Sequence, residues 1–257
     1  MFQSRCATWA PRLEHLVLAM GLLTATGTVR AQAVIGSSTY INAPTYVSHS
    51  PRGSFGLLAV ADDGSTYFSA NGFEPAFAIG VKHLSANGQA VHFAAAVTRG
   101  DAFDLLLTSS TVVVVGRTGH DELPIIGGFQ TELGQDPLSP SIYLSTTGDA
   151  YVARLDATDG SLAYSTFLGG SELDRAHAVT EAPDGGLIVV GTTWSLDFPV
   201  VDAHQAELAG DSDAFVARIA PDGASLVFST YLGGTARDEL TGVVIGNDGS
   251  LWVVGRT

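Results

Sequence analysis

Residues 149–155 read DAYVARL, and the same pattern returns at residues 213–219 as DAFVARI. The alignment continues without a gap to Thr193 and Thr257, and 21 of its 45 positions are identical. A third and more divergent copy lies upstream, where residues 114–118 (VVGRT) match the last five residues. The chain is therefore an array of one repeated unit, and the unit decides the fold.

Within a unit the residue pattern is that of β-strands. Tyr151, Ala153 and Leu155 alternate with Val152 and Arg154. Residues 162–168 and 176–180 are rich in β-formers, and residues 187–190 are apolar throughout. Aspartate-glycine pairs between these runs predict hairpin turns, because glycine takes positive φ without steric cost. Four antiparallel strands in about 45 residues are typical of one blade of an all-β β-propeller, with a solenoid or a sandwich as the competing architectures.

The spacing of the units predicts about three and a half blades within residues 57–257. We expect blades at residues 74–118, 149–193 and 213–257, and a half blade at residues 57–73. This number falls short of a usual closed ring, so the ends should present unpaired apolar blade faces. We expect later repeats to close the ring, with the half blade completing the last one; pairing of two copies is the alternative.

The connector between the last two units is residues 194–212, and it carries a predicted helical turn at residues 203–208 with Asp202 as its cap. Two glycines that follow the second strand, Gly170 and Gly234, are expected at positive φ. On that basis Gly234→Ala should destabilise the fold by roughly 1 kcal/mol or more.

The longest shared motif is YSTFLGGS at residues 164–171, followed by Asp174, Asp184-Gly185, VVGTT at residues 189–193 and Asp197-Phe198-Pro199. This motif closely resembles the bacterial seven-bladed β-propeller repeat (SBBP repeat) family, well over residues 149–257 and loosely over residues 74–133. The resemblance implies a propeller in exported or surface proteins, and it implies no catalytic residues. The chain departs from the family at residues 136–148, which lengthen one connector.

The first 33 residues resemble an export signal. Arg5 and Arg12 precede an apolar run at residues 16–25, and Ala31-Gln32-Ala33 fits signal peptidase, so we expect cleavage after Ala33. An uncut N-terminal membrane anchor is the alternative. Residues 34–56 are then an N-terminal lead-in, and the mature chain should be secreted or attached to the cell surface without a transmembrane segment.

Composition limits the possible partners and chemistry. Loss of residues 1–33 removes Cys6, the only cysteine, which excludes disulfides, thiolate metal sites and thiol catalysis from the mature chain. It also leaves 9 basic against 25 acidic side chains. So acidic a chain is a poor partner for nucleic acid or anionic membranes, and a protein or polysaccharide partner at the cell surface is more in keeping with it.

No residue pattern in the chain predicts a catalytic, cofactor-binding or metal site. Gly169-Gly170 lacks the lysine of a phosphate loop, and the histidines show no zinc-site spacing. Asp174 and Asp238 recur in register, and we expect them to accept backbone N–H bonds, with calcium binding as the alternative. We therefore expect no cofactor apart from this calcium alternative.

Three further features allow a binding interpretation, and each has a plainer one. Arg99-Gly100-Asp101 spells an adhesion tripeptide but is expected in a turn between strands. Trp194 could stack on a sugar ring, although packing between blades is favoured. Trp252 aligns with Ile188 and is predicted to be core.

The function expected from these patterns is a non-catalytic scaffold or adhesion-type binding module outside the cytoplasm. A propeller enzyme, such as a lyase or hydrolase, is one alternative and would need acids or histidines converging from several blades. A carbohydrate-binding or calcium-binding module is the other. A fold by itself carries no function, so a choice among these requires a site.

Overall fold

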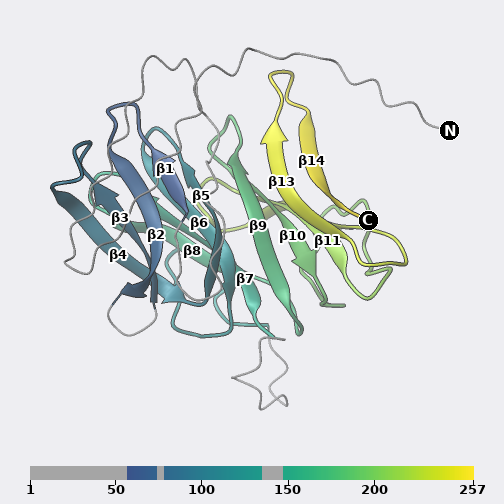
Figure 1. Ribbon diagram of the computed structural model, residues 1–257. Helices are drawn as coiled ribbons and strands as arrows, with labels where there is room; N and C mark the ends of the chain where they lie inside the picture. Colours follow the sequence, from purple (N-terminus) through teal and green to yellow (C-terminus); the bar gives the residue numbers. More distant parts are fainter. Residues whose placement is uncertain (1–56, 74–77, 135–146) are drawn as a thin grey trace. The chain divides into compact units, whose positions relative to one another are not determined.

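The computed structural model describes residues 57–73, 78–134 and 147–257 (Figure 1). The expected signal peptide and lead-in, residues 1–56, lie outside these ranges. The described part is all-β and contains three four-stranded antiparallel sheets and one two-stranded sheet, so the prediction of about three and a half propeller blades is confirmed.

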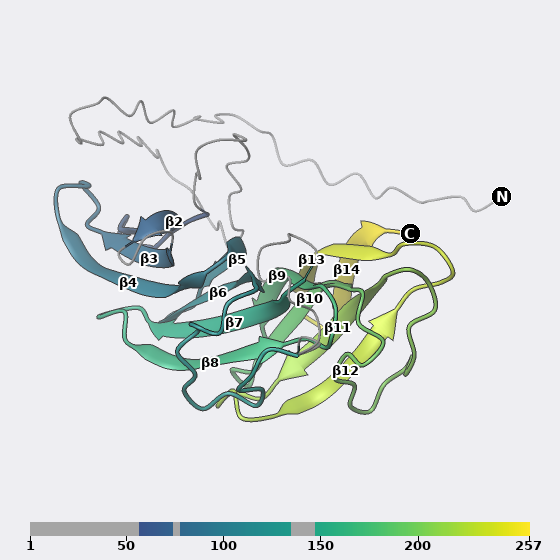
Figure 2. The same cartoon turned by 90° about the horizontal axis from the view of Figure 1, so that it is seen from below.

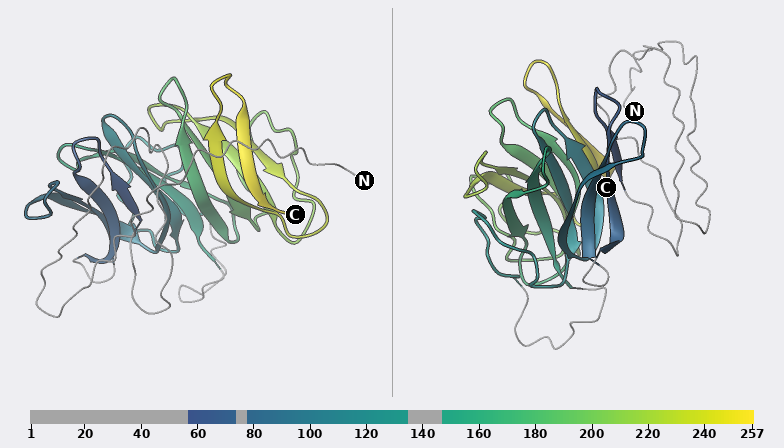
Figure 3. Two further views of the ribbon diagram at one scale, coloured as in Figure 1. Left: turned by 45° about the horizontal axis from the view of Figure 1, so that its top comes forward. Right: turned by 90° about the vertical axis from the view of Figure 1, so that its left-hand side faces the viewer.

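Each sheet is a meander in which neighbouring strands follow one another along the chain. The first sheet contains β1 (Leu58–Val60), β2 (Thr66–Phe73), β3 (Ala78–Leu84) and β4 (Val91–Arg99). The second contains β5 (Asp101–Leu107), β6 (Thr111–Thr118), β7 (Asp149–Asp156) and β8 (Leu162–Leu168), which Figure 2 shows side by side. The third contains β9 (Asp174–Glu181), β10 (Leu187–Thr193), β11 (Asp213–Ile219) and β12 (Leu226–Leu232). The last is the hairpin of β13 (Glu239–Ile245) and β14 (Leu251–Arg256), yellow in Figure 3.

The blades begin at a different point of the repeat from the one predicted. Residues 149–193 contribute β7 and β8 to one sheet and β9 and β10 to the next, so 74–118, 149–193 and 213–257 are not blades. The half blade at residues 57–73 is likewise wrong, because β1 and β2 are completed by β3 and β4. The incomplete blade is instead the C-terminal hairpin. A repeat in sequence defines a period but leaves open where the structural unit starts.

The connector at residues 194–212 joins two adjacent strands of one blade and folds back along the outer edge. Val201 forms a β-bridge with Ser229 of β12, and Ile126 in the preceding connector forms the same bridge with Ser165 of β8. The predicted helical turn at residues 203–208 does not form, and Asp202 has φ +46° instead of capping a helix. By occupying β12 and β8, the connectors cover edges that would otherwise be open to strand pairing.

The core consists of layers between successive sheets. Along β6, Val113 and Val115 pack with the third sheet, whereas Val112 and Val114 pack with the first. β10 is buried at every position, as the apolar run at residues 187–190 predicted, and it likewise divides its side chains between two neighbours. Both faces of a central strand are therefore covered, which is the packing that a stack of blades requires.

Candidate functional site

The first strand of each sheet forms the inner side of its blade. β5 contacts both β1 and β9, and β9 contacts β13, whereas β4, β8 and β12 are the last strands of their sheets. Side chains that several blades present together must therefore come from these first strands, and three of them, β5, β9 and β13, occupy equivalent positions in successive repeats.

These three inner strands carry a β-bulge at the same position. In β9 the pairing shifts after Ala176↔Gly191, and the same shift follows Ala102↔Gly116 in β5 and Leu240↔Gly255 in β13. A bulge inserts one residue and re-aims the neighbouring side chains, and it is frequent next to binding sites. The residue just before the shifted pair is charged in all three strands: Asp101, Arg175 and Glu239. The inserted residue is Phe103, His177 and Thr241, respectively.

The charged residues before the bulges are held by partners on the neighbouring strand or directly after it. Asp101 Oδ2 accepts a bond from Arg117 NH2 at 2.7 Å, and Glu239 forms an ion pair with Arg256. The guanidinium carbon of Arg175 lies 5.5 Å from the centre of the Trp194 ring, which is a cation–π distance. The inner strands thus carry acidic, basic and acidic groups in succession, and we call Asp101, Arg175, His177 and Glu239 the inner-strand cluster.

His177 connects two blades within the inner-strand cluster. Its Nδ1 lies 3.0 Å from the carbonyl oxygen of Leu240 and 3.3 Å from Glu239 Oε1, and its ring meets Phe103 edge-on at a centroid distance of 5.6 Å. A carbonyl oxygen only accepts hydrogen bonds, so Nδ1 carries the proton. In a neutral ring this leaves Nε2 as an acceptor.

The electrostatics of the inner-strand cluster follow from its partial burial. Burial lowers the pKa of His177 below its ordinary value, and the Glu239 carboxylate opposes that shift. Burial and the nearby Arg117 charge also lower the pKa of Arg175, against the attraction of Asp101 and Glu239. The cluster therefore offers a cation, carboxylates and a neutral imidazole at neutral pH, beside the aromatic rings of Phe103 and Trp194. Such a set suits hydrogen bonding to a polar ligand.

A second set of polar residues repeats in both complete copies and supports the fold. Asp174 Oδ2 accepts the Gly170 N–H at 2.9 Å, and Asp238 Oδ2 accepts the Gly234 N–H at 2.8 Å, which confirms the role expected for these aspartates. Asp149 and Asp213 each accept an amide N–H from a connector glutamine, Gln130 at 2.9 Å and Gln205 at 2.6 Å. Because the bonds recur in register, they belong to the scaffold of the blade.

The two glycines that precede these aspartates lie in the loops between successive blades, and the predicted reason for them is wrong. Neither Gly170 nor Gly234 has positive φ. A Cβ on Gly170 would overlap Asp197 Oδ1 and lie 2.7 Å from Ser195 Cβ, whereas a Cβ on Gly234 would meet nothing within 4 Å. Close packing therefore explains Gly170, and nothing in the structure explains Gly234.

The adhesion tripeptide and the two tryptophans have definite places. Arg99 ends β4 and binds Glu122, while Asp101 begins β5 and binds Arg117, so both charged side chains of the tripeptide already have partners. Trp194 packs beside Arg175. Trp252 is 66% exposed, so its prediction as core is wrong, because β14 has no strand on its outer side.

Sequence reasoning missed the inner-strand cluster. The signal was present in the alignment, because Arg175 and His177 align with Glu239 and Thr241 inside a motif whose flanking aspartates are identical. Across residues 57–73, 78–134 and 147–257, no three histidine, cysteine, aspartate or glutamate side chains are grouped to hold a metal ion. The same ranges contain no helix long and apolar enough to span a membrane.

Comparison with known proteins finds similarity to solved structures. No protein-family model and no curated protein matches the chain. Among solved structures, the quinohemoprotein alcohol dehydrogenase ADHIIG from Pseudomonas putida HK5 aligns over 77% of this chain and 30% of its own, with a TM-score of 0.39 and 13% identity. BamB from Moraxella catarrhalis aligns over 76% of this chain and 59% of its own, with a TM-score of 0.26 and 14% identity.

The chain thus spans less than two thirds of either protein, and similarity at this level does not extend to function. In its own topology, each four-stranded meander runs from an inner to an outer strand, and successive meanders pack against one another. This arrangement identifies the chain as a β-propeller protein.

Proposed function

We propose that the chain is an exported, non-catalytic binding module of the adhesion type, which takes a protein or polysaccharide ligand on its inner-strand cluster. One observation carries this proposal. Asp101, Arg175 and Glu239 change charge at one equivalent position on adjacent inner strands, although the bulge and the glycine that pairs beside it are kept in all three. A change of side-chain charge at a position whose backbone geometry is kept is expected where that position contacts a ligand.

The chemistry of the cluster favours binding over catalysis. The two carboxylates of the cluster already form ion pairs with arginines on the neighbouring strands, and the neutral His177 donates to a backbone carbonyl. The resemblance of residues 149–257 to the SBBP repeat family supports the same proposal, because that motif describes a blade and carries no catalytic residues.

Binding is tested on arrays of bacterial surface glycans and of peptides with the intact chain. Arg175→Ala and His177→Ala should each lower the affinity for the ligands that bind on the array by about tenfold, in line with the loss of one charged or hydrogen-bonding contact. Arg237→Ala is the matched control, because the Arg237 side chain is 72% exposed and outside the cluster. Equal binding by all three variants, or turnover of a bound glycan or peptide into products, contradicts the proposal.

Export is tested separately by mass spectrometry of the protein produced in a Gram-negative host. We expect a species that begins at Val34 outside the cytoplasm, because the Ala31-Gln32-Ala33 sequence follows an apolar run of suitable length. Protein that retains Met1 in the cytoplasm contradicts this part of the proposal.

A further inference from the structure

The inner strands carry a repeated ion pair, and Arg175 interrupts it. In the second sheet, Asp101 of β5 lies directly opposite Arg117 of β6, and the two form an ion pair. In the last sheet, Glu239 of β13 and Arg256 of β14 occupy the equivalent positions and also form an ion pair. In the third sheet the inner strand carries Arg175 instead of an acid, so the order of charges is broken at this blade.

The residue opposite Arg175 is a threonine, which cannot balance its charge. Thr192 of β10 pairs with Arg175 in the ladder, is 3% exposed, and has no hydrogen-bond partner for its Oγ1. The Arg175 side chain forms no hydrogen bond or ion pair with any residue in the ranges that the structure describes, and its Nε is buried. Its one described contact of this kind is the cation–π contact with Trp194. A buried donor and a buried hydroxyl without partners are costly, and such a cost is expected where a ligand binds.

The blades on both sides of Arg175 leave its charge uncompensated. β9 packs between β5 and β13, and both of these strands lie in the described ranges. Their acids already pair with arginines, so this part of the inner side carries three arginines against two carboxylates. Burial lowers the pKa of Arg175, and the positive charge of Arg117 lowers it more than either Asp101 or Glu239 raises it. In a chain with a formal net charge of −14, an anion is therefore attracted to this position.

We propose that Arg175 binds the carboxylate of a uronic acid residue in an acidic polysaccharide. This inference rests on the proposed binding function of the inner-strand cluster and names the class of its ligand. A guanidinium presents parallel N–H donors that match the two oxygens of a carboxylate, and the contact with the Trp194 ring restricts where this guanidinium lies. The ligand thus supplies the negative charge that this blade lacks.

His177 favours a sugar acid over an acidic peptide. Its Nδ1 donates to the Leu240 carbonyl, so the neutral ring accepts a hydrogen bond at Nε2, and no group in the described chain donates one. His177 is two residues from Arg175 on β9, so a short saccharide can reach both. A uronic acid carries hydroxyl donors on the ring carbons beside its carboxylate, whereas an aspartate or glutamate side chain carries none. Phe103 and Trp194 add aromatic surface next to these polar groups, as is usual in ligand sites.

The test measures the binding of uronic acid oligomers to the full chain by isothermal titration calorimetry. The panel contains oligomers of galacturonic, glucuronic, mannuronic and guluronic acid, and the methyl ester of each oligomer is its matched control. Esterification removes the negative charge and keeps the hydroxyl groups, so this comparison needs no change in the protein. We expect at least one acid to bind, and its ester to bind at least about tenfold more weakly, through the loss of one charge-assisted contact.

A protein variant assigns this charge effect to one residue. Arg175→Gln should weaken binding of the acid by about tenfold and leave binding of the ester unchanged, because the charge pair can be lost only once. Arg237→Gln is the control, since the Arg237 side chain is 72% exposed outside the cluster, and it should change neither affinity. Melting curves of both variants show that they are folded, and the ester comparison remains valid without them.

The inference and the proposed function fail in different ways. Binding of an acid that is weakened by esterification and by Arg175→Gln, but not by Arg237→Gln, supports the inference. Binding of no acid oligomer, or equal binding of acid and ester, overturns it. So does a glutamate oligomer that binds as tightly as the acids with the same dependence on Arg175. In each of these cases an array ligand that depends on His177 leaves the proposed function standing, whereas the lack of any ligand that depends on the cluster contradicts that function.

Discussion

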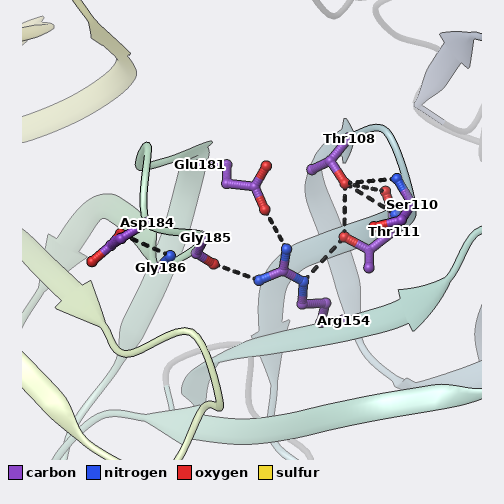
Figure 4. Close-up of polar contacts among 8 residues, drawn as sticks. All are labelled: Thr108, Ser110, Thr111, Arg154, Glu181, Asp184, Gly185 and Gly186. Carbon is purple, nitrogen blue, oxygen red and sulfur yellow. Dashed lines mark hydrogen bonds and ion pairs between the residues drawn. The ribbon is translucent and has the colours of Figure 1, made fainter.

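Arg154 on β7 donates from NH1 to the carbonyl oxygen of Gly185 at 2.6 Å, so a side chain of one blade holds the hairpin turn of the next (Figure 4). Its Nε donates to Thr111 Oγ1 at 3.0 Å in its own blade, and its NH2 pairs with Glu181 on β9. The Arg154 side chain is only 11% exposed, so water competes little for these charge-assisted hydrogen bonds.

The equivalent arginine provides a matched comparison. Arg218 is 32% exposed and pairs through NH2 with Asp184 at 2.6 Å. We expect Arg154→Ala to lower the free energy of unfolding by about 1–3 kcal/mol, because it removes three hydrogen bonds and leaves their half-buried acceptors unsatisfied. Arg218→Ala should cost at most about 1 kcal/mol, as for an exposed ion pair. Urea unfolding of both variants measures the difference, and equal losses would contradict the interblade role of Arg154.

A second pair of variants separates crowding from backbone conformation. Gly170→Ala should destabilise the fold by about 1–3 kcal/mol, because the added Cβ collides with Ser195 and Asp197. Gly234→Ala should change the free energy of unfolding by no more than about 0.5 kcal/mol, because the space around Gly234 is open and its φ is not positive. Thermal melts of the two variants decide this, and a larger loss for Gly234→Ala would restore the explanation expected from the sequence.

The third prediction concerns stability against pH. Burial raises the pKa of Asp149 to about 8, and burial raises the pKa of Asp174 to about 7. The two carboxyl groups lie together around Gly169, where a Cβ would be 2.7 Å from Asp149 Cγ and 2.6 Å from Asp174 Oδ2. The folded chain therefore holds protons that the unfolded chain releases near pH 4.

The sign of the effect follows from this difference in proton binding. The stabilisation is fully present below about pH 4 and is lost as the pH rises through 7 to 8. Asp149→Asn should make the free energy of unfolding less dependent on pH. At pH 8 it should raise that free energy by a few kcal/mol, to order of magnitude. Urea unfolding at pH 5, 6.5 and 8 measures it, with Asp211→Asn as an exposed control. Stability of the unmodified chain that increases over this range would refute the assignment.

Much of the fold could be predicted from local sequence. The alternation at residues 151–155, the Asp-Gly turns and the apolar run of β10 all specify strands and hairpins through short-range physics, and Gly160 and Gly185 do have positive φ. The backbone-binding roles of Asp174 and Asp238 were also predictable, because a carboxylate that recurs beside a turn usually accepts the free N–H groups there.

The start of each blade was not predictable in this way, because it depends on contacts between distant parts of the chain. The connector at residues 194–212 looks like a link between blades, but it spans two paired strands, since Val201 and Gln205 bind β12. The inner-strand cluster depends on the same missing information. Arg175 and Glu239 become neighbours only when β9 and β13 pack as adjacent inner strands.

The assignment of β10 and β11 to one blade supports both the inner-strand cluster and the open edge of β14, and disulfide trapping tests it most directly. In a Cys6→Ser background, Ile188→Cys with Arg218→Cys places two thiols on directly opposed positions of β10 and β11. Ser165→Cys with His177→Cys instead joins β8 and β9, which would pair only if residues 149–193 formed a blade. We predict that the first pair forms a disulfide in the folded protein and that the second does not. A disulfide in the second pair and none in the first would contradict the account.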